Sequence, residues 1–282
     1  MISIETRDDV EKLNNGNQIK GVFPELENSK IEFVGKNNIL YCEEGVHLYK
    51  SVLTMKADNS VIYLGRNRNI YKLKVVVYND CVFHMGRNNY INDHLRVILS
   101  EQRHCFIGDD CLFSLGVWIR NSDPHLIYSC ETGMRINPSE SVYIGDHVWI
   151  GQNCLILKGT QIDSGCIIGG MSVVAGKHIS YNEAWAGNPA KRISDKIFWD
   201  RASVHAWIQE QTDISNNYAE YLEKYKQGYT KDFWIYNYSE KEVIEYSILD
   251  KQLIEAENSQ ERCNILIELN KNKEKNRFAH SE

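Results

Sequence analysis

The sequence predicts a mainly β protein whose parallel strands wind into a solenoid, followed by a helical C-terminal region. Three observations support this fold class. Aliphatic residues recur at every sixth position between residues 144 and 174, glycine-containing units repeat upstream about one coil apart, and helical patterns replace both after residue 192. A six-residue period differs from the roughly 3.6 residues of a helix and the roughly 2 of an isolated strand, so it indicates a repeat architecture.

The clearest repeat begins at residue 144. Its aliphatic positions are Ile144, Ile150, Ile156, Ile162, Ile168 and Val174. Mostly small residues follow four positions later, at Val148, Cys154, Thr160, Cys166, Ser172 and His178. Branched aliphatic side chains favour buried parallel strands, so we expect them to point inward and stack from coil to coil, with the small residues at tight corners.

The coils upstream are less regular. The unit Ile107–Cys111 copies the repeat, and glycine units at 85–88, 64–67 and 34–37 precede it. We therefore predict an N-terminal segment at residues 1–29, a β-helix domain at residues 30–192 and a helical extension at residues 193–282. Within the extension, the pattern after Asn216 predicts a helix that stops before Gly228.

The register of the repeat breaks between Ile119 and Ile144, a gap that six does not divide. The sequence therefore predicts an excursion from the solenoid at about residues 120–143. This excursion contains the run Ser122-Asp123-Pro124-His125. Loops that leave a rigid scaffold often carry function, and a neutral imidazole near pH 7 can accept the proton of an attacking hydroxyl. His125 is therefore the candidate catalytic base, and the competing interpretation is an ordinary exposed histidine.

The composition narrows the class of protein. The formal net charge of −6 at pH 7 argues against general binding to nucleic acid or anionic membranes. We see neither a secretory leader nor an apolar run of membrane-spanning length, and we predict a cytoplasmic protein. Four of the eight cysteines fall on the repeat, so we expect reduced, buried thiols at Cys105, Cys111, Cys154 and Cys166.

Together these motifs resemble those of the hexapeptide-repeat acyltransferases. The resemblance rests on residues 144–151 (IGDHVWIG), 168–174 (IGGMSVV) and 186–191 (AGNPAK), with the His125 excursion, and covers about residues 105–192. It implies a left-handed parallel β-helix, acetyl-CoA as the acetyl donor and no metal. Within the family, the chain is most similar to enzymes that O-acetylate polysialic acid capsules. The implied activity is acetyl transfer to a hydroxyl of a bacterial surface polysaccharide, with sialic acid as the expected acceptor.

The resemblance also reaches individual residues. It makes His125 the general base and Trp149 a wall beside the reacting groups, although an outward tryptophan is equally typical of a packed interface. Glycines admit an extended pantetheine arm and cations suit the phosphates of CoA, whereas tight corners and solvated charges are the alternatives. The candidate CoA-binding residues are Gly151, Gln152, Gly169, Gly170, Ala175, Gly176, Lys177, Lys191 and Arg192. Ala175 departs from the family, which often carries a polar or bulkier residue there.

Three cations each follow a glycine in the early repeat units, at Lys36, Arg66 and Arg87. If these units stack in register, the cations align on one face at about 5 Å per coil, which suits a polyanionic sugar chain. The alternative is a solvated face paired with nearby acids.

A three-sided coil has flat outer faces that can pack around a threefold axis, and the family resemblance also implies a homotrimer. The candidate contact residues are the aromatic side chains expected to point outward, Trp118, Trp149 and Trp185. A loop that leaves one coil can then reach a neighbouring copy.

Several other functions compete with acetyl transfer to a hydroxyl. An N-acetyltransferase acting on an amino sugar or sugar nucleotide is the nearest alternative, and a non-catalytic binding solenoid is disfavoured by the His125 excursion. A zinc carbonic anhydrase needs converging histidines, and the H-x-x-x-x-H spacing is absent. An acyl-enzyme through Cys111, Cys154 or Cys166 is disfavoured because these thiols are expected inside the coil.

Overall fold

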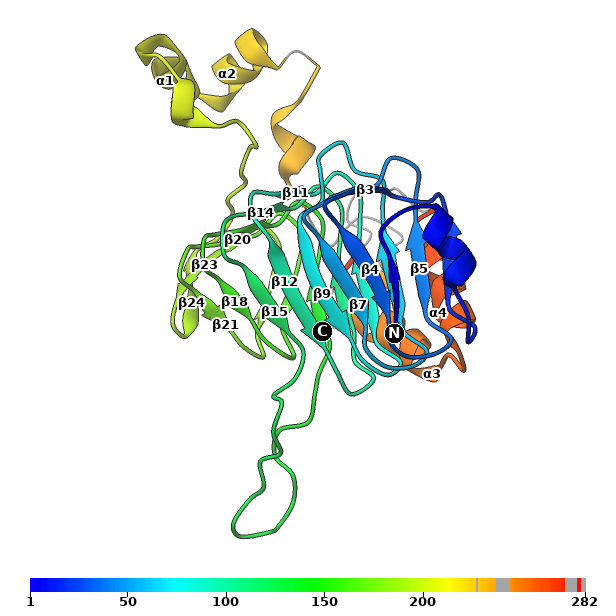
Figure 1. Ribbon diagram of the computed structural model, residues 1–282. Helices are drawn as coiled ribbons and strands as arrows, with labels where there is room; N and C mark the ends of the chain where they lie inside the picture. Colours follow the sequence, from blue (N-terminus) through cyan, green and yellow to red (C-terminus); the bar gives the residue numbers. More distant parts are fainter. Residues whose placement is uncertain (227, 237–243, 272–277, 280–282) are drawn as a thin grey trace.

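The computed structural model describes residues 1–226, 228–236, 244–271 and 278–279. Its body is a three-sided solenoid in which the strands of successive coils stack into three sheets (Figure 1). Neighbouring strands within the sheets pair in parallel, except β1 with β4 and β23 with β24. The predicted fold class, mainly β with stacked parallel strands, is confirmed.

The three sheets are named A, B and C here. Sheet A contains β1 (Ile2–Ile4), β4 (Lys30–Phe33), β7 (Val52–Met55), β9 (Leu73–Val77), β12 (Leu95–Leu99), β15 (Trp118–Arg120), β18 (Leu155–Ile156) and β21 (Val173–Val174). Sheet B contains β2 (Gln18–Gly21), β5 (Ile39–Cys42), β8 (Val61–Leu64), β10 (Val82–Met85), β13 (Cys105–Ile107), β16 (Val142–Ile144), β19 (Gln161–Ile162) and β22 (His178–Ile179).

Sheet C contains β11 (Tyr90–Ile91), β14 (Leu112–Phe113), β17 (Trp149–Ile150), β20 (Ile167–Ile168), β23 (Ala184–Gly187) and β24 (Ala190–Ser194). In the first coils, the separate pair of β3 (Glu25–Glu27) and β6 (His47–Tyr49) takes the place that sheet C has in the later coils, after sheet B and before sheet A. Parallel pairing already begins with β2 on β5, ahead of the residue-30 boundary drawn from the sequence.

The inward aliphatic residues form the core. All six positions from Ile144 to Val174 are fully buried, and Ile144 pairs with Ile162 because three six-residue repeats complete one coil. The last coil is one residue shorter, so Ile162 pairs with Ile179. The prediction that His178 fills an inner corner is therefore wrong: its side chain points outward and lies 3.2 Å from the Asp163 carboxylate.

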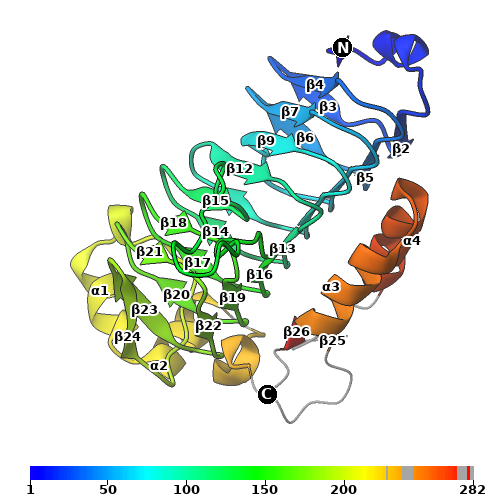
Figure 2. The same cartoon turned by 90° about the horizontal axis from the view of Figure 1, so that it is seen from below.

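Two C-terminal helices cover sheet B. Helices α3 (Tyr246–Glu255) and α4 (Ser259–Leu269) lie along its outer surface (Figure 2). Their apolar residues form a second core with outward side chains of sheet B. This core contains Ile39, Val61, Tyr63, Val82, Phe106, Tyr143, Tyr246, Leu249, Leu253, Cys263, Leu266 and Leu269.

A further part of the extension projects beyond sheet C. It contains α1 (Gln209–Ser215) and α2 (Tyr218–Tyr225), so the helix predicted before Gly228 is present. Short 3₁₀ helices occur at Asp8–Lys12, Val204–Ala206 and Lys231–Trp234, and a small parallel pair joins β25 (Ile244–Glu245) to β26 (Phe278–Ala279). None of the helices within the described residues is long and apolar enough to cross a membrane.

Candidate functional site

The excursion forms a hairpin at the corner between sheets A and B. It occupies residues 121–141, between β15 and β16, and projects away from the solenoid (green, bottom of Figure 1). Its two legs meet at a bridge between Tyr128 and Arg135. Apolar side chains remain exposed along it, with Leu126 58% and Ile136 61% exposed. The hairpin therefore carries the candidate base outward together with apolar surface.

Ion pairs fix the neck of this hairpin to two different coils. Lys158 Nζ lies 2.6 Å from the Asp123 carboxylate, on the corner after β18. Two guanidinium nitrogens of Arg135 each donate to Glu101 at 2.8 Å, on the corner after β12. Hydrogen bonds from Arg135 and from the Ser139 hydroxyl lower the pKa of Glu101 to about 2. The neck is thus charged and braced on both sides.

His125 lies on the outgoing leg, directly after Pro124. Its side chain is exposed, and the imidazole ring makes no hydrogen bond to any residue that the structure describes. Its backbone carbonyl accepts a hydrogen bond of 2.8 Å from Asn137 Nδ2. The ring is therefore open to an incoming substrate while the backbone beneath it is held.

Trp149 lies on β17 in sheet C, and 38% of it is exposed. Its indole Nε1–H donates to Ser114 Oγ at 3.3 Å, and its ring centroid is 5.9 Å from that of Trp199. Because the His125 hairpin leaves from the corner between sheets A and B, the two candidate catalytic residues lie on different sides of the coil. One chain does not bring them together.

Beside Trp149, the buried ring of His147 anchors the projecting extension. Its ring centroid lies 3.9 Å from that of Trp199 and 3.8 Å from that of Trp234, with one ring on each side. His147 Nε2 is 3.0 Å from the Trp199 carbonyl, and Trp199 Nε1–H donates to the His147 carbonyl at 2.9 Å. Burial lowers the pKa of His147 to about 3, so the ring is neutral at pH 7.

Four of the candidate CoA-binding residues lie at the corner between sheets C and A, namely Gly151, Gln152, Gly169 and Gly170. Coil packing accounts for at least two of the glycines. A Cβ at Gly151 would lie 2.5 Å from the backbone nitrogen of Gly170, and a Cβ at Gly169 would lie 2.9 Å from Ala186 Cβ. Contact between coils therefore demands glycine here whether or not a ligand binds.

Ala175, Gly176 and Lys177 lie at the other corner, between sheets A and B. They are exposed and follow the Lys158 corner by one coil, since the Gly176 N–H donates to the Lys158 carbonyl at 3.0 Å. Gly176 has φ of +55°, which favours glycine. This set is therefore on the same edge of the solenoid as the His125 hairpin.

The last two candidates for CoA binding lie on β24, at the end of sheet C. Lys191 is exposed, whereas Arg192 is paired with the Glu183 carboxylate at 2.9 Å. The predicted CoA-binding residues are thus divided between two corners and one sheet edge. A single CoA molecule touching all of them within one chain does not follow from this arrangement.

The predicted alignment of Lys36, Arg66 and Arg87 on one face is wrong for Lys36. Lys36 follows β4 at the corner between sheets A and B, whereas Arg66 and Arg87 follow β8 and β10 at the corner between sheets B and C. Arg66 and Arg87 do lie in adjacent coils, because the Asn88 N–H donates to the Arg66 carbonyl at 3.1 Å. Arg87 is held by the Glu43 carboxylate.

The outward position expected of Trp185 is also wrong. Trp185 pairs in register with the inward Ile168, packs against the solenoid core and donates from Nε1 to Glu183 at 2.7 Å. It covers the end of the core. Trp118, by contrast, is 38% exposed on sheet A.

The cysteines are reduced, and their thiols differ sharply in exposure. Cys130 on the hairpin is exposed, and the other seven are buried. Burial raises the pKa of the Cys111, Cys154 and Cys166 thiols, which makes thiolate chemistry at these positions unfavourable.

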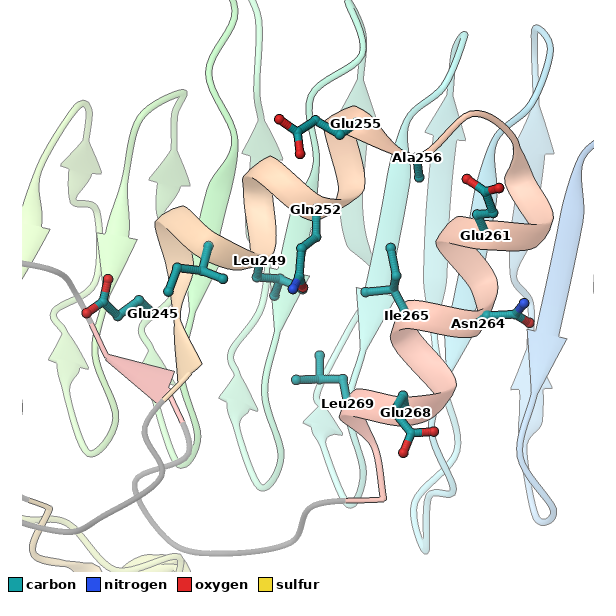
Figure 3. Close-up of a pocket in the computed structure, with 11 residues that line it drawn as sticks. Glu245, Leu249, Gln252, Glu255, Ala256, Glu261, Asn264, Ile265, Glu268 and Leu269 are labelled. Atoms are coloured by element: carbon teal, nitrogen blue, oxygen red, sulfur yellow. The ribbon is translucent and has the colours of Figure 1, made fainter.

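A concave surface of about 920 Å³ lies between α3 and α4 (Figure 3). Its apolar floor includes Leu249, Ile265 and Leu269, and glutamates such as Glu255 and Glu261 line its rim. It contains none of the predicted site residues.

Two residues of the neck, Asn137 and Lys158, are not among the site residues predicted from the sequence. Lys158 could have been suspected from its place at a corner next to the break in register. Asn137 offers only its position ahead of Pro138, because its hydrogen-bond partners are set by how the hairpin folds back.

Comparisons with known proteins agree with this architecture. A family model described as bacterial transferase hexapeptide (six repeats) matches residues 141–176. The polysialic acid O-acetyltransferase of Neisseria meningitidis is 29% identical over 190 residues, which are 67% of this chain and 88% of that protein.

Solved structures extend the likeness to three dimensions. The crystal structure of the polySia-specific acetyltransferase NeuO has a TM-score of 0.60 and 30% identity, covering 73% of this chain and 94% of that one. The polysialic acid O-acetyltransferase OatWY has a TM-score of 0.51 and 25% identity, covering 71% of this chain and 98% of that one. The predicted left-handed β-helix and the resemblance stated from the sequence are confirmed. The chain belongs to the hexapeptide-repeat acyltransferases.

Proposed function

We propose that this protein transfers the acetyl group of acetyl-CoA to a hydroxyl of a surface polysaccharide that contains sialic acid. We further propose that it acts as a homotrimer in which His125 of one copy meets Trp149 of a neighbouring copy. The observation that carries this proposal is the braced hairpin, which holds an open His125 away from Trp149 and exposes apolar side chains beside it. The similarity to acetyltransferases that act on polysialic acid supports this acceptor class.

In the proposed reaction, the His125 imidazole accepts the proton of the acceptor hydroxyl as its oxygen attacks the thioester carbonyl. The tetrahedral intermediate then collapses, the carbon–sulfur bond breaks and the imidazolium returns the proton to the CoA sulfur. Loss of such a base typically costs about 10²–10⁴-fold in turnover. The indole N–H of Trp149 is a candidate donor to the oxyanion, once it turns from Ser114 Oγ.

The acetyl donor, acetyl-CoA, would lie along the edge of the solenoid that carries Ala175, Gly176 and Lys177. The hairpin leaves from the same edge. Lys177 and Lys191 are exposed cations suited to phosphate. The glycines at the other corner, Gly151, Gly169 and Gly170, would border the same donor only across an interface between copies. This division of the candidate residues also favours a site shared by two chains.

The first test measures CoA release with polysialic acid, free sialic acid and an amino sugar as acceptors. We expect turnover with polysialic acid and its loss by two or more orders of magnitude in His125→Ala. Acetylation of the amino sugar alone would support the N-acetyltransferase alternative instead. Release of CoA with none of the acceptors would contradict the proposed acceptor class.

The second test addresses the shared site by mixing subunits. His125→Ala and Trp149→Ala chains are each expected to be impaired, and coexpression creates interfaces with both residues intact. Equal mixing restores one interface in four, hence about a quarter of wild-type activity. Trimers that contain both chains yet stay as impaired as the parents would contradict the shared site.

A further inference from the structure

Asn137 uses all of its hydrogen-bonding capacity inside the neck of the hairpin. It is 5% exposed. Its Oδ1 accepts from the Ile127 N–H at 2.9 Å and from Arg135 Nε at 3.3 Å. Its Nδ2 donates to the His125 carbonyl at 2.8 Å and to Asp123 Oδ2 at 3.2 Å. Two acceptor positions and two donor positions are what a side-chain amide offers, so the group is saturated.

These contacts also fix the direction of the amide. Reversing it would place the amino group against the N–H donors of Ile127 and Arg135, and the oxygen against the His125 carbonyl and the Asp123 carboxylate. All four pairs would then be unfavourable. The orientation is therefore set by the neck itself.

The contacts of the Asn137 amide hold the backbone on both sides of Leu126. The carbonyl of His125 and the N–H of Ile127 bind the same amide, which reaches them from the returning leg of the hairpin. Pro124 restricts the backbone just before His125. Since the His125 ring has no described hydrogen-bond partner of its own, its position follows from this backbone.

The amide also joins the two ion pairs of the neck. Asp123 binds Lys158 on one coil, and Arg135 binds Glu101 on another. Asn137 touches both Asp123 and Arg135, so it connects the hairpin to the solenoid on either side. The neck is one continuous polar network with this side chain at its centre.

We propose that Asn137 is the positioning residue of the reaction: it aims the His125 base by clamping residues 125–127. This inference rests on the proposed function, because it assumes that His125 takes the proton. A misplacement of about 1 Å can cost on the order of 10²-fold in rate. Removing the clamp therefore affects the chemical step and leaves the binding of CoA intact.

The test compares Asn137→Ala with Thr132→Ala, a change at the tip of the same hairpin whose hydroxyl accepts one bond from the Met134 N–H at 3.3 Å. We expect Asn137→Ala to lower kcat about 10–100-fold, with KM for acetyl-CoA within about twofold of wild type, and Thr132→Ala to stay near wild type. Asn137→Asp keeps the acceptor oxygen and loses both donors, so its kcat should also fall.

A double variant separates positioning from folding. In a His125→Ala background, Asn137→Ala should cause no further loss, because there is no base left to aim. An equal loss in both backgrounds, or a kcat for Asn137→Ala and Asn137→Asp that matches Thr132→Ala, would overturn the proposal. Near-normal turnover of His125→Ala would instead remove the proposed function, so the two failures are distinguishable.

Discussion

Sheet B and the excursion hairpin differ in how far their apolar side chains are buried. On sheet B, Phe106 and Tyr143 are almost completely buried because α3 and α4 cover them, and Tyr246 contributes a fully buried ring. On the hairpin, Leu126 and Ile136 are more than half exposed. Within a single chain, the apolar side chains on the outer face of sheet B are therefore buried, whereas those of the hairpin stay exposed. Exposed apolar surface beside a candidate base is what a contact with a second copy would use.

Thiol labelling tests this contrast most strongly. Cys130 on the hairpin is exposed, whereas Cys263 on α4 is fully buried and its pKa is raised to about 11 by that burial. A buried thiol reacts only when the structure opens, so we expect Cys130 to react ~10³-fold faster or more. Mass spectrometry of the labelled peptides measures both rates. Similar rates would show that the helical cover opens freely.

Core truncation tests the covered side. Tyr246→Ala removes a buried ring that packs at a tilt against the Tyr143 ring, with the two centroids 4.9 Å apart. We expect a loss of about 3–5 kcal/mol in the free energy of unfolding, as for other large-to-small core changes. Ile136→Ala on the hairpin is the matched change and should leave the stability of each chain nearly unaltered while weakening self-association. Urea unfolding and light scattering measure the two effects, and a large loss of chain stability in Ile136→Ala would reverse the comparison.

Acid should destabilise the buried region around His104. His104 is buried, its Nδ1 accepts from the Val82 N–H, and burial lowers its pKa to about 4. Between about pH 6.5 and pH 4 the unfolded chain binds a proton there and the folded chain does not, so stability is complete above that window and falls as pH drops through it. The shift corresponds to on the order of 3 kcal/mol.

Urea midpoints measured across this pH range give the slope. His104→Asn should reduce this slope, and the slope that remains should include His147, whose pKa burial lowers to about 3. A wild-type slope in His104→Asn would mean that other groups dominate the acid response.

The strict repeat made the later coils predictable, and its loss explains where prediction failed. From Ile144 to Val174 every step has the same length, so inward positions followed from counting. One missing residue before Ile179 was enough to misplace His178. In the early coils, strands of unequal length hide which corner a glycine occupies, and Lys36 was assigned to the wrong one.

The candidate site was predictable only in part, for a different reason. The break in register identified the excursion and hence His125. The clamp of Asn137 depends on a side chain that meets partners on the opposite leg and on two coils, and no local pattern encodes such contacts. Likewise, the separation of His125 from Trp149 depends on which side of the coil each corner faces.

The smallest expected effect concerns the two cations that do share a corner. The Arg66 side chain is exposed, whereas Arg87 is partly buried and held by Glu43, which also accepts from the Tyr63 hydroxyl at 2.8 Å. Arg66→Gln should change the free energy of unfolding by less than about 0.5 kcal/mol, and Arg87→Gln should cost about 1 kcal/mol. If the corner guides a polyanionic acceptor, Arg66→Gln also raises KM for polysialic acid by about twofold. Screening should remove that increase at about 1 M salt, where the Debye length is about 3 Å. An equal KM change with a short neutral sugar would mean that Arg66 is only part of a solvated surface.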